Sequence, residues 1–184
     1  MKTLLAIACF SIFINSYSQQ DKILEIREYY YSVKKTIESQ TPDSAWTYYS
    51  DQIIRNRQDL PWRAIGIFHD TITFWYSDLM SAAMENDTEG DSTDALVLVT
   101  SSAQLSMMFI YREWLFLEGN LIFYYDRMIG YDEDSTWEYR YYFDNNKLIR
   151  FMQGNQIISY DDDPNEILQF GEEIKSLFNT IINL

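Results

Sequence analysis

The sequence contains only one cysteine and one histidine. Cys9 lies in a segment that we expect to be removed, so the remaining chain has no thiol. This excludes disulfides, thiolate metal sites and cysteine nucleophiles together. His69 is the sole histidine, so a metal site would consist of carboxylates and a serine triad would need His69 as its base. Stability must come from a hydrophobic core, for which 47% apolar residues supply ample material.

Hydrophobic runs long enough to cross a membrane are also missing. The apolar run from Leu4 to Ile14 is too short to span a bilayer. It follows a basic residue and precedes Ser16 and Ser18, small residues placed as in an export signal. The sequence therefore predicts a signal peptide over residues 1–18, cleaved before Gln19, and export to the periplasm or the extracellular space. We expect no membrane insertion after cleavage.

A lipoprotein processing site at Cys9, in the stretch LAIAC, is the alternative. It would leave only about half of a normal hydrophobic segment before the cut. Ala6 is also a weak residue at the third position before that cut. Cleavage before Gln19 is therefore favoured, and residues 19–184 have the size of a single compact domain.

Positive charge is scarce: 14 basic residues stand against 28 acidic ones, and the net charge is −14 at pH 7. A chain this acidic repels phosphate backbones and anionic membrane surfaces, so we expect no nucleic acid partner. An unknown protein or glycan, cationic or neutral, is the expected partner. Solubility alone also explains an acidic balance.

An amphipathic helix is predicted near the start of the chain. Apolar residues recur at helical spacing from about Lys22 to Ser39, with Asp21 as an N-cap and Pro42 as a stop. The opposite face is charged, and we expect it to be solvated; it carries Lys22, Glu25, Arg27, Lys34 and Lys35.

A second helix is predicted near the end of the chain. Asp163, Pro164 and Glu166 form a capping box with a first-turn proline. An apolar stripe follows, made of Ile167, Phe170, Ile174, Leu177, Phe178 and Ile181. Gly171 weakens this helix modestly.

Short segments rich in aromatic and β-branched residues occupy the middle of the chain. They read WTYYSDQIIRN, WRAIGIF, TITFWYS, ALVLVTS, MMFIYREWLFL, LIFYYDRMI, WEYRYYF and KLIRFM. Short hydrophilic connections between most of them indicate antiparallel hairpins. The sequence thus predicts an α+β fold, in which a twisted or curved antiparallel β-meander is packed by an N-terminal and a C-terminal helix.

The last hairpin predicts two unlike faces. If Asn145-Asn146 is a two-residue turn with positive φ, Phe143 faces Leu148, Tyr141 faces Arg150 and Tyr139 faces Met152. One face then holds mostly core residues: Trp137, Tyr139, Tyr141, Phe143, Leu148 and Met152, with Arg150 against the rings. The other face holds Glu138, Arg140, Tyr142, Ile149 and Phe151.

The preceding hairpin is predicted to turn at Glu118-Gly119, since a turn one residue later would place like charges opposite each other. This register pairs Trp114 with Phe123 and Phe116 with Leu121. The core face then holds Trp114, Phe116, Leu121 and Phe123, and the other face holds Tyr111, Glu113, Tyr124 and Asp126.

Three stretches carry a resemblance: EIREYYYSVKK, IIRNRQDLPWRAIGIF and EYRYYFDNNKLIRF. They resemble a group of small, uncharacterised exported proteins of Gram-negative bacteria. The resemblance covers most of residues 19–184 and rests on patterned aromatic strands. It implies export, and it implies no catalytic residue because the group has no established activity.

Metal binding and histidine catalysis are both weakly supported. The segment 161–172 has oxygen ligands at several calcium-loop positions, but Glu166 stands where the sharp turn needs glycine, so a helix start is favoured. The acidic loop 85–94 could bind calcium weakly. His69 lies beside Asp70 in a predicted turn, where a polar turn residue is favoured over a general base. We therefore expect no metal and no cofactor.

A carboxylate-based hydrolase stays open as one alternative, because Glu113, Asp126 and Glu138 lie on neighbouring predicted strands. The favoured function is an exported, non-catalytic binding or interaction module. Its candidate binding patch is aromatic and charged: Tyr111, Tyr124, Arg140, Tyr142 and Phe151. As a further alternative, the chain carries an apolar small molecule between the curved sheet and a helix.

Overall fold

A computed structural model of the chain describes residues 2–41, 47–64, 66–79, 92–132 and 134–184, with only the backbone described for residues 2–18, 92 and 93. The elements, in chain order, are α1 (Lys2–Ser39), β1 (Tyr49–Arg55), β2 (Phe68–Tyr76), a 3-10 turn (Ser92–Ala95), β3 (Leu96–Leu105), β4 (Met108–Leu117), β5 (Asn120–Ile129), β6 (Trp137–Asp144), β7 (Lys147–Gln153), β8 (Gln156–Ile157) and α3 (Asn165–Ile182). The expected acidic loop 85–94 lies largely outside the described residues.

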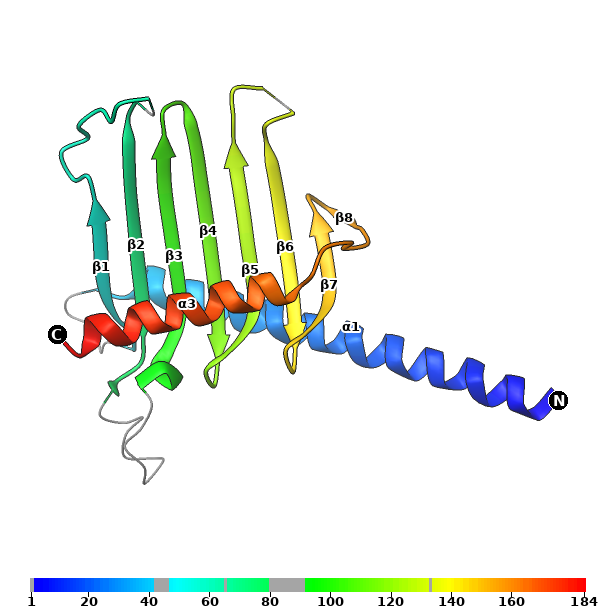
Figure 1. Cartoon of the computed structure of the whole chain (residues 1–184). Coiled ribbons are helices and arrows are strands. Elements are labelled where there is room, and N and C mark those ends of the chain that lie inside the picture. Colours follow the sequence, from blue (N-terminus) through cyan, green and yellow to red (C-terminus); the bar gives the residue numbers. More distant parts are fainter. Residues whose placement is uncertain (1, 42–46, 65, 80–91, 133) are drawn as a thin grey trace.

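The fold is α+β, as predicted, with one curved, unclosed antiparallel sheet whose eight strands follow each other in chain order. Figure 1 shows α3 crossing the sheet on one face and α1 lying behind the other face. Both helices cross the half of the sheet that contains the β4–β5 and β6–β7 turns, so the opposite half is less covered.

Helix α1 ends at Ser39, as predicted, but begins at Lys2. Asp21 therefore lies inside the helix and is not an N-cap. Figure 1 shows the N-terminal part of α1 projecting beyond the edge of the sheet. Of the helices in the described residues, neither is long and apolar enough to cross a membrane. Export and cleavage before Gln19 stay predictions.

Helix α3 begins close to the predicted place. Asp163 Oδ1 accepts the backbone N–H of Asn165 at 3.0 Å, while Pro164 is the N-cap residue without a side-chain cap bond. Gly171 has a packing role, because a Cβ there would lie 3.0 Å from Leu121 Cδ2 on the sheet. The glycine thus lets α3 approach the sheet closely.

The strand predictions hold except at two places. Segment 62–68 was predicted to be a strand, but among its described residues it forms an isolated bridge between Trp62 and Gly66 and enters the sheet only at Phe68. The two-residue strand β8 was not predicted. Both hairpin turns are correct: Glu118, Gly119, Asn145 and Asn146 all have positive φ.

Three β-bulges shape the sheet. Beyond the pairs Phe116–Leu121 and Phe143–Leu148 the register shifts by one residue, and the same happens between β2 and β3. The extra residues are Val97, Ile122 and Ile149, and all three pack in the cluster beneath α1. Bulges bend and twist a strand pair, which accounts for part of the curvature.

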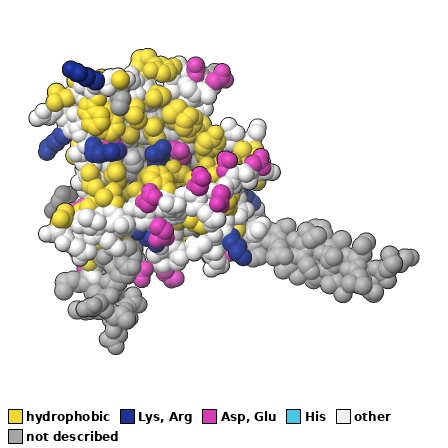
Figure 2. Space-filling model, viewed as in Figure 1, with side chains coloured by type: hydrophobic (Ala, Val, Ile, Leu, Met, Phe, Trp, Pro, Cys, Tyr) yellow, Lys and Arg dark blue, Asp and Glu magenta, His cyan; other side chains and the backbone are white. Residues whose placement is uncertain are grey.

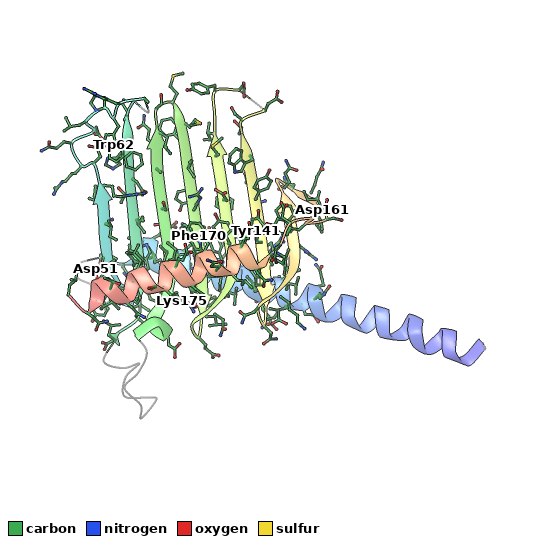
Figure 3. The ribbon with its side chains drawn as sticks, viewed as in Figure 1. Asp51, Trp62, Tyr141, Asp161, Phe170 and Lys175 are labelled. Carbon is green, nitrogen blue, oxygen red and sulfur yellow. The ribbon has the colours of Figure 1, made fainter. Side chains whose placement is uncertain are left out.

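The two faces of the sheet carry separate cores. On the α3 face, Trp114 and Tyr124 pack against Phe170 of α3, with Trp114 and Phe170 edge to face at 5.1 Å between ring centroids. Tyr141 and Phe151 belong to the same core and pack against Tyr160, which precedes α3. Figure 3 labels Phe170 and Tyr141 where α3 crosses the sheet. Figure 2 shows hydrophobic side chains gathered on the sheet beyond α3.

Candidate functional site

The structure divides the five predicted site residues between the two faces. Tyr111, Arg140 and Tyr142 share the α1 face. Tyr124 and Phe151 belong to the core beneath α3, so their predicted place beside Tyr142 is wrong. Phe123 and Met152, predicted for the opposite face, lie under α1 instead.

The bulges explain these corrections. The predicted pairs Tyr141–Arg150, Tyr139–Met152 and Trp114–Phe123 assumed uninterrupted register. The observed pairs place Arg150 opposite Tyr142, Met152 opposite Arg140 and Tyr124 opposite Trp114. Because side chains alternate between faces, a one-residue shift moves every later side chain of that strand to the other face.

The predicted exposed aromatic patch does not exist as such. Tyr124 is 3% exposed, Tyr142 is 3% exposed and Phe151 is 8% exposed. Helix α1 covers Tyr142. On the other face, Phe170 of α3 packs on Tyr124, and Tyr160, which precedes α3, packs on Phe151. Only Tyr111 is half-buried among the tyrosines of that prediction. An interaction through exposed rings at these positions is therefore not available.

On the α1 face, register places the side chains of β4 to β7 in three rows. The near row, under α1, holds Leu115, Phe123, Tyr142 and Arg150. The middle row holds Glu113, Tyr125, Arg140 and Met152. The outer row holds Tyr111, Arg127 and Glu138. Neighbouring rows are about 6.6 Å apart, since two residues separate them along each strand.

Helix α1 packs on the near row through Ile23, Ile26 and Val33, which are fully buried. Where the helix surface turns away from the middle and outer rows, a pocket of about 600 Å³ remains. Its floor is buried and is made by Ile26, Glu113, Phe123, Tyr142 and Met152. Its rim is exposed and includes Arg27, Tyr31, Arg127 and Asn155.

Glu113 is the buried charge of this pocket, with only 2% of its surface exposed. Its carboxylate accepts three hydrogen bonds: from Tyr30 Oη and Tyr111 Oη, each at 2.5 Å, and from Lys34 Nζ at 2.8 Å. Two of these donors come from α1 and one from the same strand. Glu113 thus ties the helix to the sheet, and its charge is balanced within the pocket.

The two tyrosines bound to Glu113 are strongly disposed to stay protonated. Burial is the main cause that raises the pKa of Tyr30 well above its usual value, and the hydrogen bond to Glu113 and that carboxylate's charge add to it. The pKa of Tyr111 is raised for the same reasons in the same order. Both hydroxyls therefore act as hydrogen-bond donors at neutral pH.

Four basic side chains line the pocket: Arg27, Lys34, Arg127 and Arg140. Arg140 pairs with Glu138, donates to the carbonyl of Gly154 and lies over the ring of Tyr125 at 5.7 Å. Arg27 and Lys34 were predicted to lie on a solvated helix face, and instead they contribute to the pocket. The amphipathic pattern of a helix shows which residues face away from its apolar stripe, but it does not show which other elements lie beside those residues.

The sequence favoured neither histidine catalysis nor a metal site, and the described residues place His69 as follows. His69 and Asp70 lie in strand β2, not in a turn; Asp70 pairs with Arg55, while His69 Nδ1 lies 2.8 Å from Asp59 and Nε2 lies 3.2 Å from Thr71. Among the described residues, no serine forms a hydrogen bond with His69. The described part of the chain also contains no cluster of three or more side chains that could hold a metal.

The three carboxylates of the hydrolase alternative are separated by the sheet. Glu113 and Glu138 share the α1 face, whereas Asp126 lies on the α3 face, paired with Arg112 at 3.3 Å. Glu113 and Glu138 are also bound to basic side chains. Hydrolysis of a glycoside requires two carboxyl groups that flank the scissile bond, and these three residues do not form such a pair.

Comparison with known proteins finds no matching family model, no matching curated protein and no matching solved structure. The expected relationship to exported Gram-negative proteins therefore stays a prediction.

Proposed function

We propose that the chain is a non-catalytic binding protein that takes a small molecule into the pocket between α1 and the sheet. The observation that supports this most is the combination of a volume of about 600 Å³ with an exposed rim and a buried floor that contains Phe123 and Tyr142. Ligand pockets have this size, and this one combines apolar and aromatic side chains with five charged ones.

The same observation favours small-molecule binding over the interaction module predicted from the sequence. That prediction depended on exposed rings at Tyr124, Tyr142 and Phe151, and these rings are buried. Export to the periplasm or the extracellular space remains part of the proposal, supported by the layout of residues 1–18.

A pair of fluorescent probes tests the proposal on the chain that begins at Gln19. One probe is neutral N-phenylnaphthylamine, and the other is its sulfonated analogue, anilinonaphthalene sulfonate. We expect saturable binding of at least one probe at a single site. Asn155→Trp should abolish that binding, because Asn155 is exposed at the pocket rim and an indole there would occupy the entrance.

Gln58→Trp is the matched control, since Gln58 is exposed in the loop after β1 and does not line the pocket. It should bind the probes like the parent chain. Absence of saturable binding of both probes, or equal binding by Asn155→Trp and the parent, would overturn the proposal.

A further inference from the structure

We infer that the ligand of this pocket carries one anionic group, such as a carboxylate, sulfate or phosphate, on an apolar or aromatic body. This inference rests on the proposed function and specifies its ligand class. It follows from two basic side chains, Arg27 and Arg127, that lie at the rim of the pocket without an acidic partner among the described residues. Apart from Glu113, the buried floor of the pocket is apolar or aromatic.

The charges of the lining are unbalanced. Four basic side chains face a single carboxylate, although the whole chain has a net charge of −14. Lys34 is bound to Glu113 and Arg140 is bound to Glu138. When these pairs are set aside, Arg27 and Arg127 remain, so the pocket is locally positive in an acidic protein.

Arg27 has only neutral acceptors. Its Nε donates to Tyr142 Oη at 3.2 Å, a second nitrogen lies 3.7 Å from the sulfur of Met152, and the guanidinium lies 5.6 Å from the centre of the Tyr142 ring. A guanidinium has five N–H donors, and a thioether is a weak acceptor. An oxyanion would offer Arg27 stronger, charge-assisted bonds.

A second cation beside Arg27 adds to the positive potential. Burial is the main cause that lowers the pKa of Arg150, and the charge of Arg27 is the next. Arg150 donates to the side-chain oxygen of Gln20, which is neutral. Two arginines that repel each other, with neutral partners, are a favourable surrounding for an anion.

Arg127 occupies the outer row, between Tyr111 and Glu138. The carboxylate of Glu138 is bound to Arg140 rather than to Arg127. The side chain of Arg127 is exposed, so it is positioned to meet a ligand at the pocket entrance. Beyond it on the same face lie Phe109 and Ile129, both largely exposed, which offer apolar contact to a longer ligand.

Glu113 does not cancel this preference. Its three donors, Tyr30, Tyr111 and Lys34, already neutralise and hold both carboxylate oxygens. The other four floor residues are apolar or aromatic and favour an apolar ligand body: Ile26, Phe123, Tyr142 and Met152. A strongly hydrated, fully polar anion would gain little from that floor.

The two probes named above separate this inference from the proposed function, because they differ by one sulfonate group. We expect the sulfonated probe to bind at least about tenfold more tightly than the neutral one. Arg27→Gln and Arg127→Gln should each weaken the sulfonated probe by about tenfold and leave the neutral probe unchanged. Added salt should weaken only the sulfonated probe.

Arg57→Gln is the charge-matched control, because Arg57 is exposed in the loop after β1, outside the pocket. It should leave both affinities unchanged, and the melting temperature of each variant verifies folding. Equal affinity for the two probes would overturn the anion preference while leaving the proposed function intact. Binding of neither probe would overturn both.

Discussion

At the residue scale, Glu113 joins α1 to the sheet through hydrogen bonds. Its buried carboxylate binds Tyr30 and Lys34 from the helix. We predict that Glu113→Gln lowers the free energy of unfolding by about 3 kcal/mol, because the substitution leaves the Lys34 charge without its partner. Urea unfolding measures the loss. Glu118→Gln, in an exposed turn, should cost almost nothing; equal effects of both variants would contradict the assigned role.

The tyrosines around Glu113 also predict an alkaline response. Their pKa is raised in the folded protein, whereas the unfolded chain ionises them near pH 10. Their stabilising contribution is thus complete below pH 10 and declines as the pH rises above it, because only the unfolded state then loses the protons. Tyr30→Phe and Tyr111→Phe should make the decline of the free energy of unfolding shallower.

Unfolding curves collected from pH 8 to 11 test this expectation. Tyr31→Phe is the control, since Tyr31 is exposed and forms no bond to Glu113 in the described structure. Its profile should match that of the parent. Identical slopes for all three variants would show that the Glu113 cluster does not hold these protons.

At the scale of elements, the two helices divide the sheet into two cores. Trp114 and Phe143 both lie beneath α3 and are fully buried. We predict that Trp114→Ala and Phe143→Ala each lower the free energy of unfolding by roughly 3–5 kcal/mol, as core truncations do. Chemical denaturation measures this loss of unfolding free energy. Negligible losses for both would mean that α3 does not pack on this face.

The sequence predicted which helices and strands exist better than it predicted the register in which neighbouring strands pair. Helical periodicity located the end of α1 and the span of α3, and the turn residues located both hairpin turns. The bulges at Ile122 and Ile149 escaped prediction. Because helices cover both faces, residues 121–124 are all apolar or aromatic, and around Ile149 only Arg150 breaks the apolar run from Leu148 to Met152. The alternation that would fix the register is therefore weak.

The candidate site was predicted only in part for the same reason. Tyr111, Arg140 and Tyr142 do line the pocket, but Tyr124 and Phe151 changed faces at the bulges. Arg27 and Lys34 appeared as a solvated helix face, since periodicity within one helix does not show which strands it meets. Arg127 was not predicted as a site residue, because its place beside Tyr111 and Glu138 depends on the pairing of three strands.

At the scale of the whole molecule, net charge and local charge have opposite signs. The net charge of −14 predicts a cationic or neutral partner for the protein surface. Charges farther apart than about 8 Å are largely screened at physiological ionic strength. A ligand inside the pocket therefore responds to Arg27, Arg127 and their neighbours more than to the acidic surface.

The central claim is that ligand binds between α1 and the sheet, and backbone amide NMR of the chain beginning at Gln19 tests it most directly. During titration with anilinonaphthalene sulfonate, we predict that the largest chemical-shift changes fall on residues 26–34 of α1 and around Tyr111, Phe123 and Asn155. Changes confined to the exposed apolar side chains Leu60, Trp62 and Ile67, with residues 26–34 unaffected, would contradict it.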